Sequence, residues 1–381
     1  MTDNSAGEFH AMIAASPAGS GRSVGGAWHV HGVVLPEEQP RDLWIDDGRV
    51  VEGPVAGARE LDRHCWVLPG FVDAHCHIGL GPQGAVSIGD ARQQARTDRD
   101  AGTLLVRDAG SPIDTHLFDN EPDLPRLIRA GRHIARPRRY LRGFAVEIEP
   151  EQLIDEVDRQ ARRSDGWVKL VGDWIDRGTG DLAPLWEPAI AARAIGRAHE
   201  LGCRVTAHCF GEQSVAELVG AGIDCIEHGT GVSPAVIDEM ARRQVAMVPT
   251  LVNIENFPAI ADSGQARYPR YAQHMRKLYH GHLDRMRAAR EAGVPLYAGT
   301  DAGGTIHHGR IGDEIVALGQ LGDAQFALGA ASWRSRGWLG APGLGVGESA
   351  DLVIFDADPR PDLRVCRRPC AVMLRGRLRS R

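Results

Sequence analysis

The chain has 381 residues, of which 43% are hydrophobic and 25% charged, and its formal net charge is -6. This composition excludes wholesale disorder, and the lack of a basic excess argues against nucleic acid or a membrane surface as a partner. The sequence also has no apolar stretch of about 18 residues, so we expect no membrane span.

The first 25 residues are rich in alanine, glycine and serine, and they carry Asp3 and Glu8 instead of a basic segment. They lack a sustained apolar core and are not typical of a signal peptide, so we expect a flexible extension over residues 1–25. The 7 cysteines are scattered without a CxxC spacing. This pattern favours reduced thiols and a cytoplasmic location.

Residues 26–67 contain short strand-like runs around an Asp-Asp-Gly turn at 46–48, which predicts a hairpin. Two more apolar runs, at 351–355 and 371–376, lie near the other end of the chain. Neither end has enough apolar surface for a core of its own. We therefore predict that 26–67 and 343–381 form one small β-sandwich domain together.

Residues 68–342 show a different pattern, in which apolar strand-like runs alternate with helical stretches. Eight such runs predict an α/β fold, a (β/α)8 TIM barrel, which typically needs roughly 250 residues. A doubly wound sheet is the alternative, but it does not explain why the polar residues discussed below all follow strand ends. The runs lie at 71–74, 103–107, 140–146, 168–171, 205–207, 224–226, 245–248 and 296–298, the third being the weakest. Helices are expected at 151–164, 188–201, 213–221, 233–243 and 274–292.

The pattern His-x-His occurs three times, at His29/His31, His75/His77 and His280/His282. Only the middle pair closes an apolar run, Pro-Gly-Phe-Val-Asp-Ala, so it is predicted to end a barrel strand. Side chains at i and i+2 of a strand point to the same side, and two imidazoles there can reach one metal ion. The other two pairs are interpreted as surface or core histidines.

Four further polar residues end later strand-like runs, namely Lys169, His208, His228 and Asp301. Each alone has an ordinary explanation, since strand-end histidines are often structural, a lysine can extend to solvent and an aspartate can form a turn. The carboxyl ends of barrel strands, however, meet at one mouth. We therefore expect all of these side chains and the histidine pair to converge there.

Imidazole and carboxylate ligands favour zinc, with manganese or iron as related choices. A charged Lys169 would repel a cation, but desolvation favours the neutral amine, which can add carbon dioxide. The resulting carbamate could bridge two ions that hold a hydroxide and polarise a carbonyl. Asp301 would then take the proton from that water and pass it to the leaving nitrogen. A Schiff-base role for Lys169 is the alternative, but it needs no histidine cluster.

Five segments together resemble the amidohydrolase superfamily: Pro-Gly-Phe-Val-Asp-Ala-His-Cys-His, Val-Lys-Leu, Thr-Ala-His, Ile-Glu-His-Gly-Thr and Gly-Thr-Asp-Ala-Gly. The resemblance runs over residues 26–378 and points to the imidazolonepropionase-like group, which includes Xaa-Pro dipeptidases (prolidases). It implies a site with two divalent metal ions. One ion would be bound by His75, His77, Lys169 and Asp301, and the other by carbamylated Lys169, His208 and His228.

Two departures from the family pattern bear on the substrate. Mononuclear members, such as deaminases, carry a catalytic Glu three residues after the strand-five histidine, whereas position 211 here is Gly and the nearest acid is Glu212. Together with Lys169, this favours the binuclear amide hydrolases. Dipeptidase-like members often have Gly-Gly-His after strand three, and the segment 140–144 has no histidine. Different substrate contacts are therefore expected, with Tyr140 or Arg142 as candidates.

Three more candidates for substrate binding follow strand ends, namely Trp174, Asn253 and His308. The leading hypothesis is a metal-dependent hydrolase that cleaves the amide C–N bond of a dipeptide, an N-acyl amino acid or a cyclic amide. A lactone, ester or phosphotriester hydrolase with the same binuclear site is the alternative. A non-catalytic binding protein is the third hypothesis. It predicts that some metal-ligating residues have been lost, whereas all six candidate ligand positions hold a residue that can bind metal. The sequence leaves the oligomeric state open, a homo-oligomer included.

Overall fold

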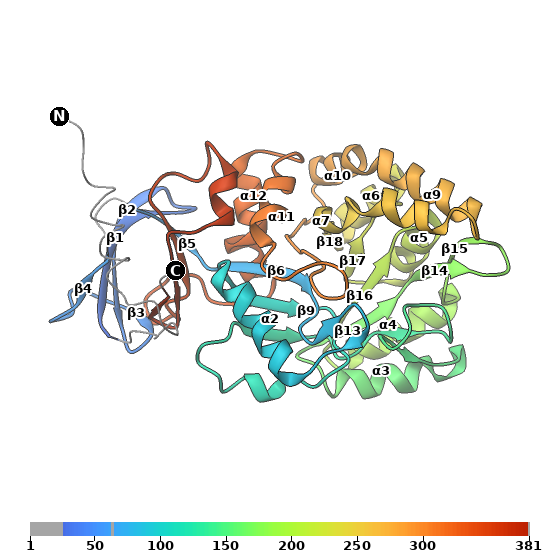
Figure 1. Ribbon diagram of the computed structural model, residues 1–381, viewed down its shortest axis with the longest axis horizontal. Helices are drawn as coiled ribbons and strands as arrows, with labels where there is room; N and C mark the ends of the chain where they lie inside the picture. The colour runs from blue at the N-terminus through green and yellow to red at the C-terminus, as the bar shows by residue number, and fades with distance from the viewer. Residues whose placement is uncertain (1–25, 62–64, 380–381) are drawn as a thin grey trace.

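The computed structural model describes residues 26–61 and 65–379. The extension predicted over residues 1–25 lies outside the described residues. Figure 1 shows strands surrounded by helices, with a small sheet at one end of the molecule. The chain enters the molecule through this sheet, passes through the alternating strands and helices, and returns to the sheet.

Eight strands form the small sheet, in the order β21-β20-β19-β5-β1-β2-β3, with β4 paired to β1. They are β1 (Trp28–Val34), β2 (Gln39–Asp46), β3 (Arg49–Val51), β4 (Arg59–Glu60), β5 (Cys65–Pro69), β19 (Leu352–Phe355), β20 (Ala371–Leu374) and β21 (Arg377–Arg379). The two ends of the chain meet where β5 pairs antiparallel with β19. The strands belong to one sheet, and the predicted two-sheet sandwich is not confirmed. The predicted domain limits stay a prediction.

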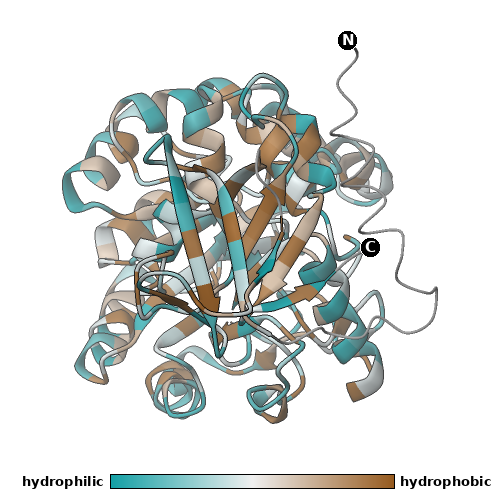
Figure 2. Ribbon diagram, turned by 90° about the vertical axis from the view of Figure 1, so that its left-hand side faces the viewer, coloured by the Kyte–Doolittle hydropathy of each residue, from teal (hydrophilic) through white to brown (hydrophobic). Residues whose placement is uncertain are grey.

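Burial along β1 alternates strictly, as expected for a strand with one face against a core. Val30 of β1 packs in one apolar cluster with Ile45 of β2, Val67 of β5 and Ile354 of β19. Figure 2 looks onto this sheet and shows hydrophobic and hydrophilic residues alternating along its strands. Burial of this shared apolar face therefore joins segments from opposite ends of the sequence.

The barrel strands form two parallel ladders. One has the order β10-β9-β6, and the other has the order β12-β11-β13-β16-β17-β18. The strands are β6 (Phe71–Cys76), β9 (Thr103–Asp108), β10 (Arg126–Arg129), β11 (Ile134–Ala135), β12 (Val146–Glu147), β13 (Trp167–Val171), β16 (Arg204–Cys209), β17 (Cys225–His228) and β18 (Ala246–Val248). Residues 296–302 connect the ladders, with bridges from Leu296 to Met247 and from Ala302 to Cys76. The fold is TIM-barrel-like, although its sheets are not joined into one closed ladder.

Helices follow most of the barrel strands. They are α2 (Ile88–Asp100), α3 (Leu153–Ala161), α4 (Pro188–Glu200), α5 (Glu212–Ala221), α6 (Pro234–Arg243), α7 (Leu251–Ile254), α8 (Phe257–Gly264), α9 (Pro269–His280), α10 (His282–Glu291), α11 (Ile311–Leu318), α12 (Ala324–Ala331) and α13 (Trp333–Trp338). Short 3-10 turns cover η1 (His116–Phe118), η2 (Pro150–Gln152) and η3 (Leu363–Arg367), and two hairpins are β7 (Leu80–Gly81) with β8 (Gly84–Ala85) and β14 (Asp173–Asp176) with β15 (Asp181–Pro184). No helix in the described part of the chain has the length and apolar character needed to cross a bilayer.

The helix ends agree with the sequence at two positions and differ at a third. Gly222 and Gln244 end α5 and α6 in the left-handed conformation that commonly terminates helices. The single helix predicted over 274–292 is instead two helices, α9 and α10, separated at Gly281. Glycine favours such a break because it loses more conformational freedom than other residues do when it enters a helix.

The predicted position of strand three is wrong. The strand that pairs with β9 is β10, with Arg126 opposite Leu105 and Arg129 opposite Asp108, whereas residues 140–145 form no strand. The apolar core of β10 is only two residues long and lies between arginines, which obscured it. Arg129 is nevertheless 6% exposed, because its guanidinium bonds Asp165 at 2.9 Å and Thr115.

Candidate metal centre

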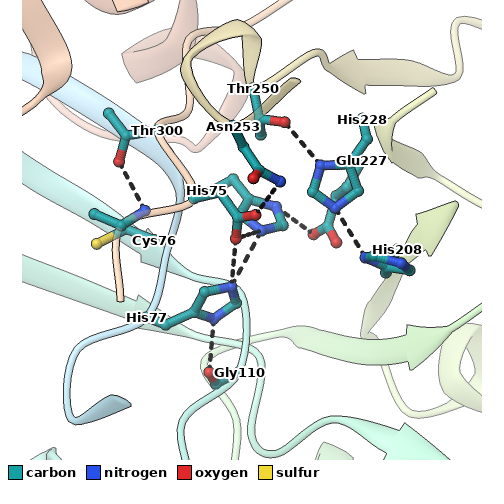
Figure 3. Close-up of polar contacts among 12 residues, drawn as sticks. His75, Cys76, His77, Gly110, His208, Glu227, His228, Thr250, Asn253 and Thr300 are labelled. Carbon is teal, nitrogen blue, oxygen red and sulfur yellow. Dashed lines mark hydrogen bonds and ion pairs between the residues drawn. The ribbon is translucent and has the colours of Figure 1, made fainter. Parts of the chain in front are cut away.

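Strand β6 carries candidate ligands to the barrel mouth. His75 and His77 project from its end to the same side, and Cys76 between them points away (Figure 3). Sγ of Cys76 lies 3.6 Å from Oδ2 of Asp98. The side chains of His75 and His77 are 1% and 5% exposed. The i, i+2 geometry expected from the sequence is therefore realised here.

Asp301 meets these two imidazoles. Its Oδ1 lies 2.9 Å from Nε2 of His75 and 3.0 Å from Nε2 of His77, and the two nitrogens are 3.1 Å apart. Nδ1 of His77 lies 2.8 Å from the carbonyl oxygen of Gly110. A proton donated from Nδ1 to that carbonyl leaves the Nε2 lone pair free for a metal ion. Three donor atoms thus face one point.

Two glycines allow Asp301 to come this close to β6. A Cβ at Gly299 would lie 2.7 Å from Cβ of His75, and one at Gly303 would lie 2.8 Å from Cβ of His77. The amide of Asp301 donates to the carbonyl of His75 at 2.8 Å, which fixes the approach. Any side chain at either glycine would push the aspartate away from the histidines.

The second pair of imidazoles comes from β16 and β17. Nε2 of His228 lies 3.0 Å from Nδ1 of His208, and Nδ1 of His228 lies 2.7 Å from Oγ1 of Thr250 (Figure 3). Burial holds the pKa of His208 well below its usual range and lowers that of His228 to about 3, so both rings are neutral, as metal ligands must be. The ring centroids of His75 and His228 are 5.2 Å apart, which joins the two pairs.

Lys169 lies beneath these histidines, with a side chain that is 1% exposed. Its Nζ contacts Oε2 of Glu227, a fully buried carboxylate. Oε1 of Glu227 accepts from Thr206 at 2.7 Å, and it also lies 3.2 Å from Nδ1 of His75 and 3.4 Å from Arg107. Burial alone would raise the pKa of Glu227, but His75 and Lys169 hold it well below its usual range. Glu227 is therefore an anion that connects Lys169 to His75.

Backbone strain concentrates at the mouth. His228, Thr250 and Asp301 have φ values of 65°, 51° and 59°, a region that non-glycine residues seldom adopt. His228 and Thr250 stand at or just after a strand end, and Asp301 belongs to the segment 296–302 that connects the two ladders. All three take part in the contacts above. Strain of this kind persists where surrounding contacts enforce it, and it clusters at functional sites.

Asp301 and its neighbours form a charged group with defined orientation. Asn253 donates to Oδ2 of Asp301 at 2.7 Å, opposite the edge that meets the histidines. Burial alone would raise the pKa of Asp301, but His75 and His77 hold it well below its usual range. Asp73 accepts from the amide of Thr300 at 3.0 Å and from that of His75 at 3.2 Å, so it ties the two ligand-bearing segments together.

Two residues of this region were missed by the sequence analysis. Glu227 went unused, although a charged residue inside an apolar run is a signal of a buried polar contact. His133 follows β10, where no histidine was expected because strand three had been assigned too late in the chain. Both of its ring nitrogens are buried without a hydrogen-bond partner among the described residues. Its ring centroid lies 5.0 Å from that of His77 and 5.4 Å from that of Tyr140.

A cavity of about 440 Å³ opens over these side chains. Tyr140, Trp174 and Asn253, three of the five predicted substrate-binding residues, line it together with Asp301. Arg142 is exposed and does not belong to its lining. Glu212, the acid nearest in sequence to the deaminase position, is engaged elsewhere, since its carboxylate bonds His274 at 2.7 Å and Lys277 at 2.9 Å.

His308 lies on the far side of β6 from the candidate ligands. Its Nδ1 is 2.8 Å from Oδ2 of Asp98 and 3.7 Å from Sγ of Cys76. Asp98 also accepts from the amide of Gly309 at 2.7 Å. These contacts attach the loop after Asp301 to helix α2, and they direct His308 away from the cavity.

Comparisons with known proteins identify the family of this chain. Residues 66–379 match the model of the amidohydrolase family. The chain belongs to the amidohydrolase family. Uncharacterised proteins of Mycobacterium tuberculosis and Mycobacterium bovis are each 58% identical to this amidohydrolase over 351 residues, which make up 92% of this chain and 95% of the relative.

Solved structures share the fold of this amidohydrolase at lower identity. A prolidase complexed with N-methylphosphonate-L-proline has a TM-score of 0.79 and 22% identity, covering 93% of this chain and 100% of that chain. The A. niger ochratoxinase has a TM-score of 0.75 and 17% identity, covering 93% and 95%. The match over residues 66–379 confirms the predicted family. The protein is an enzyme that hydrolyses C–N bonds, of a superfamily that generally uses divalent metal ions.

Proposed function

We propose that this amidohydrolase cleaves an amide bond of a small molecule with two divalent metal ions, in the manner of the prolidase-like branch. The observation that carries this proposal is the convergence of five donor side chains from four barrel segments above one buried lysine. The donors are His75, His77, His208, His228 and Asp301.

The donor set fits two ions. His75, His77 and Asp301 would hold one ion, and His208 and His228 the other, with Lys169 as a carbamate between them. Zinc suits this set best, with manganese or iron as related choices. Ions bound there would lower the pKa of a water molecule and polarise the substrate carbonyl.

The surroundings of Lys169 support its role as a carbamate. A lysine carbamate keeps one N–H, so Glu227 remains its hydrogen-bond acceptor when the positive charge is gone. An arginine would pair with Glu227 equally well, yet it has no amine that becomes neutral. This chain uses arginine at nearly all basic positions, and Lys169 and Lys277 are its two lysines. The retention of lysine at this buried position favours a role that arginine cannot perform.

Asp301 accepts the proton of the attacking water and delivers it to the leaving nitrogen. Asn253 holds its outer oxygen, so the carboxylate cannot rotate freely. His133 and Tyr140 are the candidates for contact with the substrate carbonyl, since they lie beside His77 and His208 respectively. The imidazole of His133 has two ring nitrogens without a partner among the described residues, and its N–H could donate to such a carbonyl.

Metal analysis together with a hydrolysis panel tests the proposal. Protein purified after zinc or manganese supplementation is expected to contain about two ions per chain and to hydrolyse dipeptides or N-acyl amino acids. Lactones and paraoxon-type phosphotriesters serve as the comparison. Turnover of those substrates without any amide turnover, or near-zero bound metal, would refute the proposed amide hydrolase.

A further inference from the structure

The cavity over the candidate metal centre has six aromatic side chains in its lining, beside aliphatic and small residues. They come from separate parts of the chain: the segment before β12, the hairpin β14–β15, the end of β16, and helices α8 and α9. The aromatic lining residues are Tyr140, Phe144, Trp174, Phe210, Tyr268 and Tyr271. Tyr140 and Trp174 make an edge-to-face contact with ring centroids 4.9 Å apart. Such walls favour a substrate with a bulky aromatic group.

The charges of the same cavity are few. Among the described residues that line it, Arg267 is the basic residue and Asp301 the acidic one, and His77 and His208 are candidate metal ligands. Arg267 lies between α8 and α9 and is exposed. Its guanidinium carbon is 5.2 Å from the ring of Tyr268, and it forms no ion pair with any described residue. The guanidinium therefore keeps its N–H donors available to an anion that enters the cavity.

We propose that Arg267 binds the carboxylate of an amide substrate whose aromatic group packs between the cavity walls. This inference rests on the proposed function and names its substrate class as N-acyl aromatic amino acids, including dipeptides with a C-terminal aromatic residue. The scissile carbonyl then lies at Asp301, the aromatic group lies against Trp174 and its neighbours, and the carboxylate pairs with Arg267.

Other substrate classes fit this cavity less well. Arg267 would repel a cationic substrate, and the described part of the cavity lining offers no uncommitted carboxylate to pair with the cation. Asp301, its acidic residue, already contacts two imidazoles and Asn253. A small aliphatic substrate would leave much of the 440 Å³ filled with water against aromatic walls. A neutral aromatic amide would leave the guanidinium without a partner. The aromatic carboxylate satisfies both features of the cavity.

Binding to the zinc-loaded protein tests the inference independently of catalysis. Calorimetry would compare 3-phenylpropionate with 3-phenylpropan-1-ol, which has the same ring and no charge. We expect the carboxylate to bind about 10- to 100-fold more tightly, since hydrogen bonds between charged groups are worth that much. Arg267→Gln should reduce this preference by about tenfold, beyond what direct binding of the carboxylate to zinc supplies, and substitution of Arg270, an exposed residue of α9 outside the cavity lining, by Gln should leave it unchanged.

Kinetics then test the assignment to a substrate. We expect the kcat/KM of N-acetyl-L-phenylalanine to be about tenfold or more above that of N-acetyl-L-phenylalaninol and of N-acetylglycine. Arg267→Gln should remove the advantage over N-acetyl-L-phenylalaninol and keep the advantage over N-acetylglycine. A carboxylate preference that is undiminished in Arg267→Gln overturns the inference, because the anion would then bind elsewhere. If no amide is hydrolysed while the Arg267-dependent binding persists, the proposed function fails and the assignment of Arg267 as an anion site stands.

Discussion

The two ends of the barrel use polar side chains in opposite ways. At the base, Arg204 lies over the ring of Trp167 at 4.1 Å, and Tyr297 stacks on Trp338 with ring centroids 4.3 Å apart. At the mouth, imidazoles face one another and a carboxylate, and several backbones are strained. Arg204 and Tyr297 at the base are thus engaged in ring contacts, whereas imidazoles at the mouth have ring nitrogens left for a ligand. The side chains suited to ligand binding therefore gather at the mouth, at the carboxyl ends of the strands.

Asp301→Asn should have the largest effect on the mouth. We expect kcat on the best amide of the panel to fall by about 10²- to 10⁴-fold, because the amide cannot take up a proton. Bound metal, measured by elemental analysis, should be largely retained, since one oxygen still faces the histidines. Asp284→Asn, at an exposed carboxyl of α10, provides the control. Unchanged turnover in Asp301→Asn would remove this residue as the proton carrier.

Lys169→Ala should lower activity by about 100-fold or more, with partial recovery on addition of short carboxylic acids that replace the carbamate. Lys277→Ala removes the other lysine of the chain, which is exposed on α9, and should retain activity. Rates of both variants would be measured with and without acetate or propionate. Full activity of Lys169→Ala without added acid would contradict a bridging role.

Arg107→Met would extend the comparison to the base. Arg107 is fully buried, lies over Trp167 at 4.6 Å and pairs with Glu227. Removal of one partner from a buried ion pair typically costs about 3–5 kcal/mol of the free energy of unfolding. Denaturant unfolding should reveal this loss. The number of metal ions bound per folded chain should fall by a smaller fraction than the free energy of unfolding does. A variant as stable as the wild type would show that the base does not depend on this charge.

The smallest effect is expected at His274, which links the hairpin β14–β15 to α5 through Asp181 and Glu212. Burial alone would lower the pKa of His274, but these two carboxylates raise it above its ordinary value of 6.5. The stabilisation is therefore full below about pH 6.5 and is lost as the pH rises through the raised pKa. His274→Gln should lower the free energy of unfolding by about 1 kcal/mol or less at pH 5.5. A difference that grows toward pH 9 would contradict this sign.

Local sequence patterns predicted most of the side chains that gather at the mouth, but few of the contacts among them. His75 and His77 were found because the i, i+2 spacing and the preceding apolar run are both visible in a few residues. The contacts of Glu227 with Lys169 and His75 join three strands distant in sequence, so no local spacing reveals them. His133 was missed for a different reason. An arginine-flanked pair of apolar residues gives a weak strand signal, and Arg129 is buried only because Asp165 and Thr115 satisfy its guanidinium.

The pairing of β5 with β19 also has a consequence for biosynthesis. Strand β5 emerges from the ribosome early, whereas β19 follows only after the whole barrel has been translated. Until then, one edge of β5 has unsatisfied backbone groups, and the apolar cluster beneath the sheet is incomplete. The nascent protein therefore exposes an unpaired, aggregation-prone strand edge through most of its synthesis. Binding by a chaperone would protect the chain most during this period.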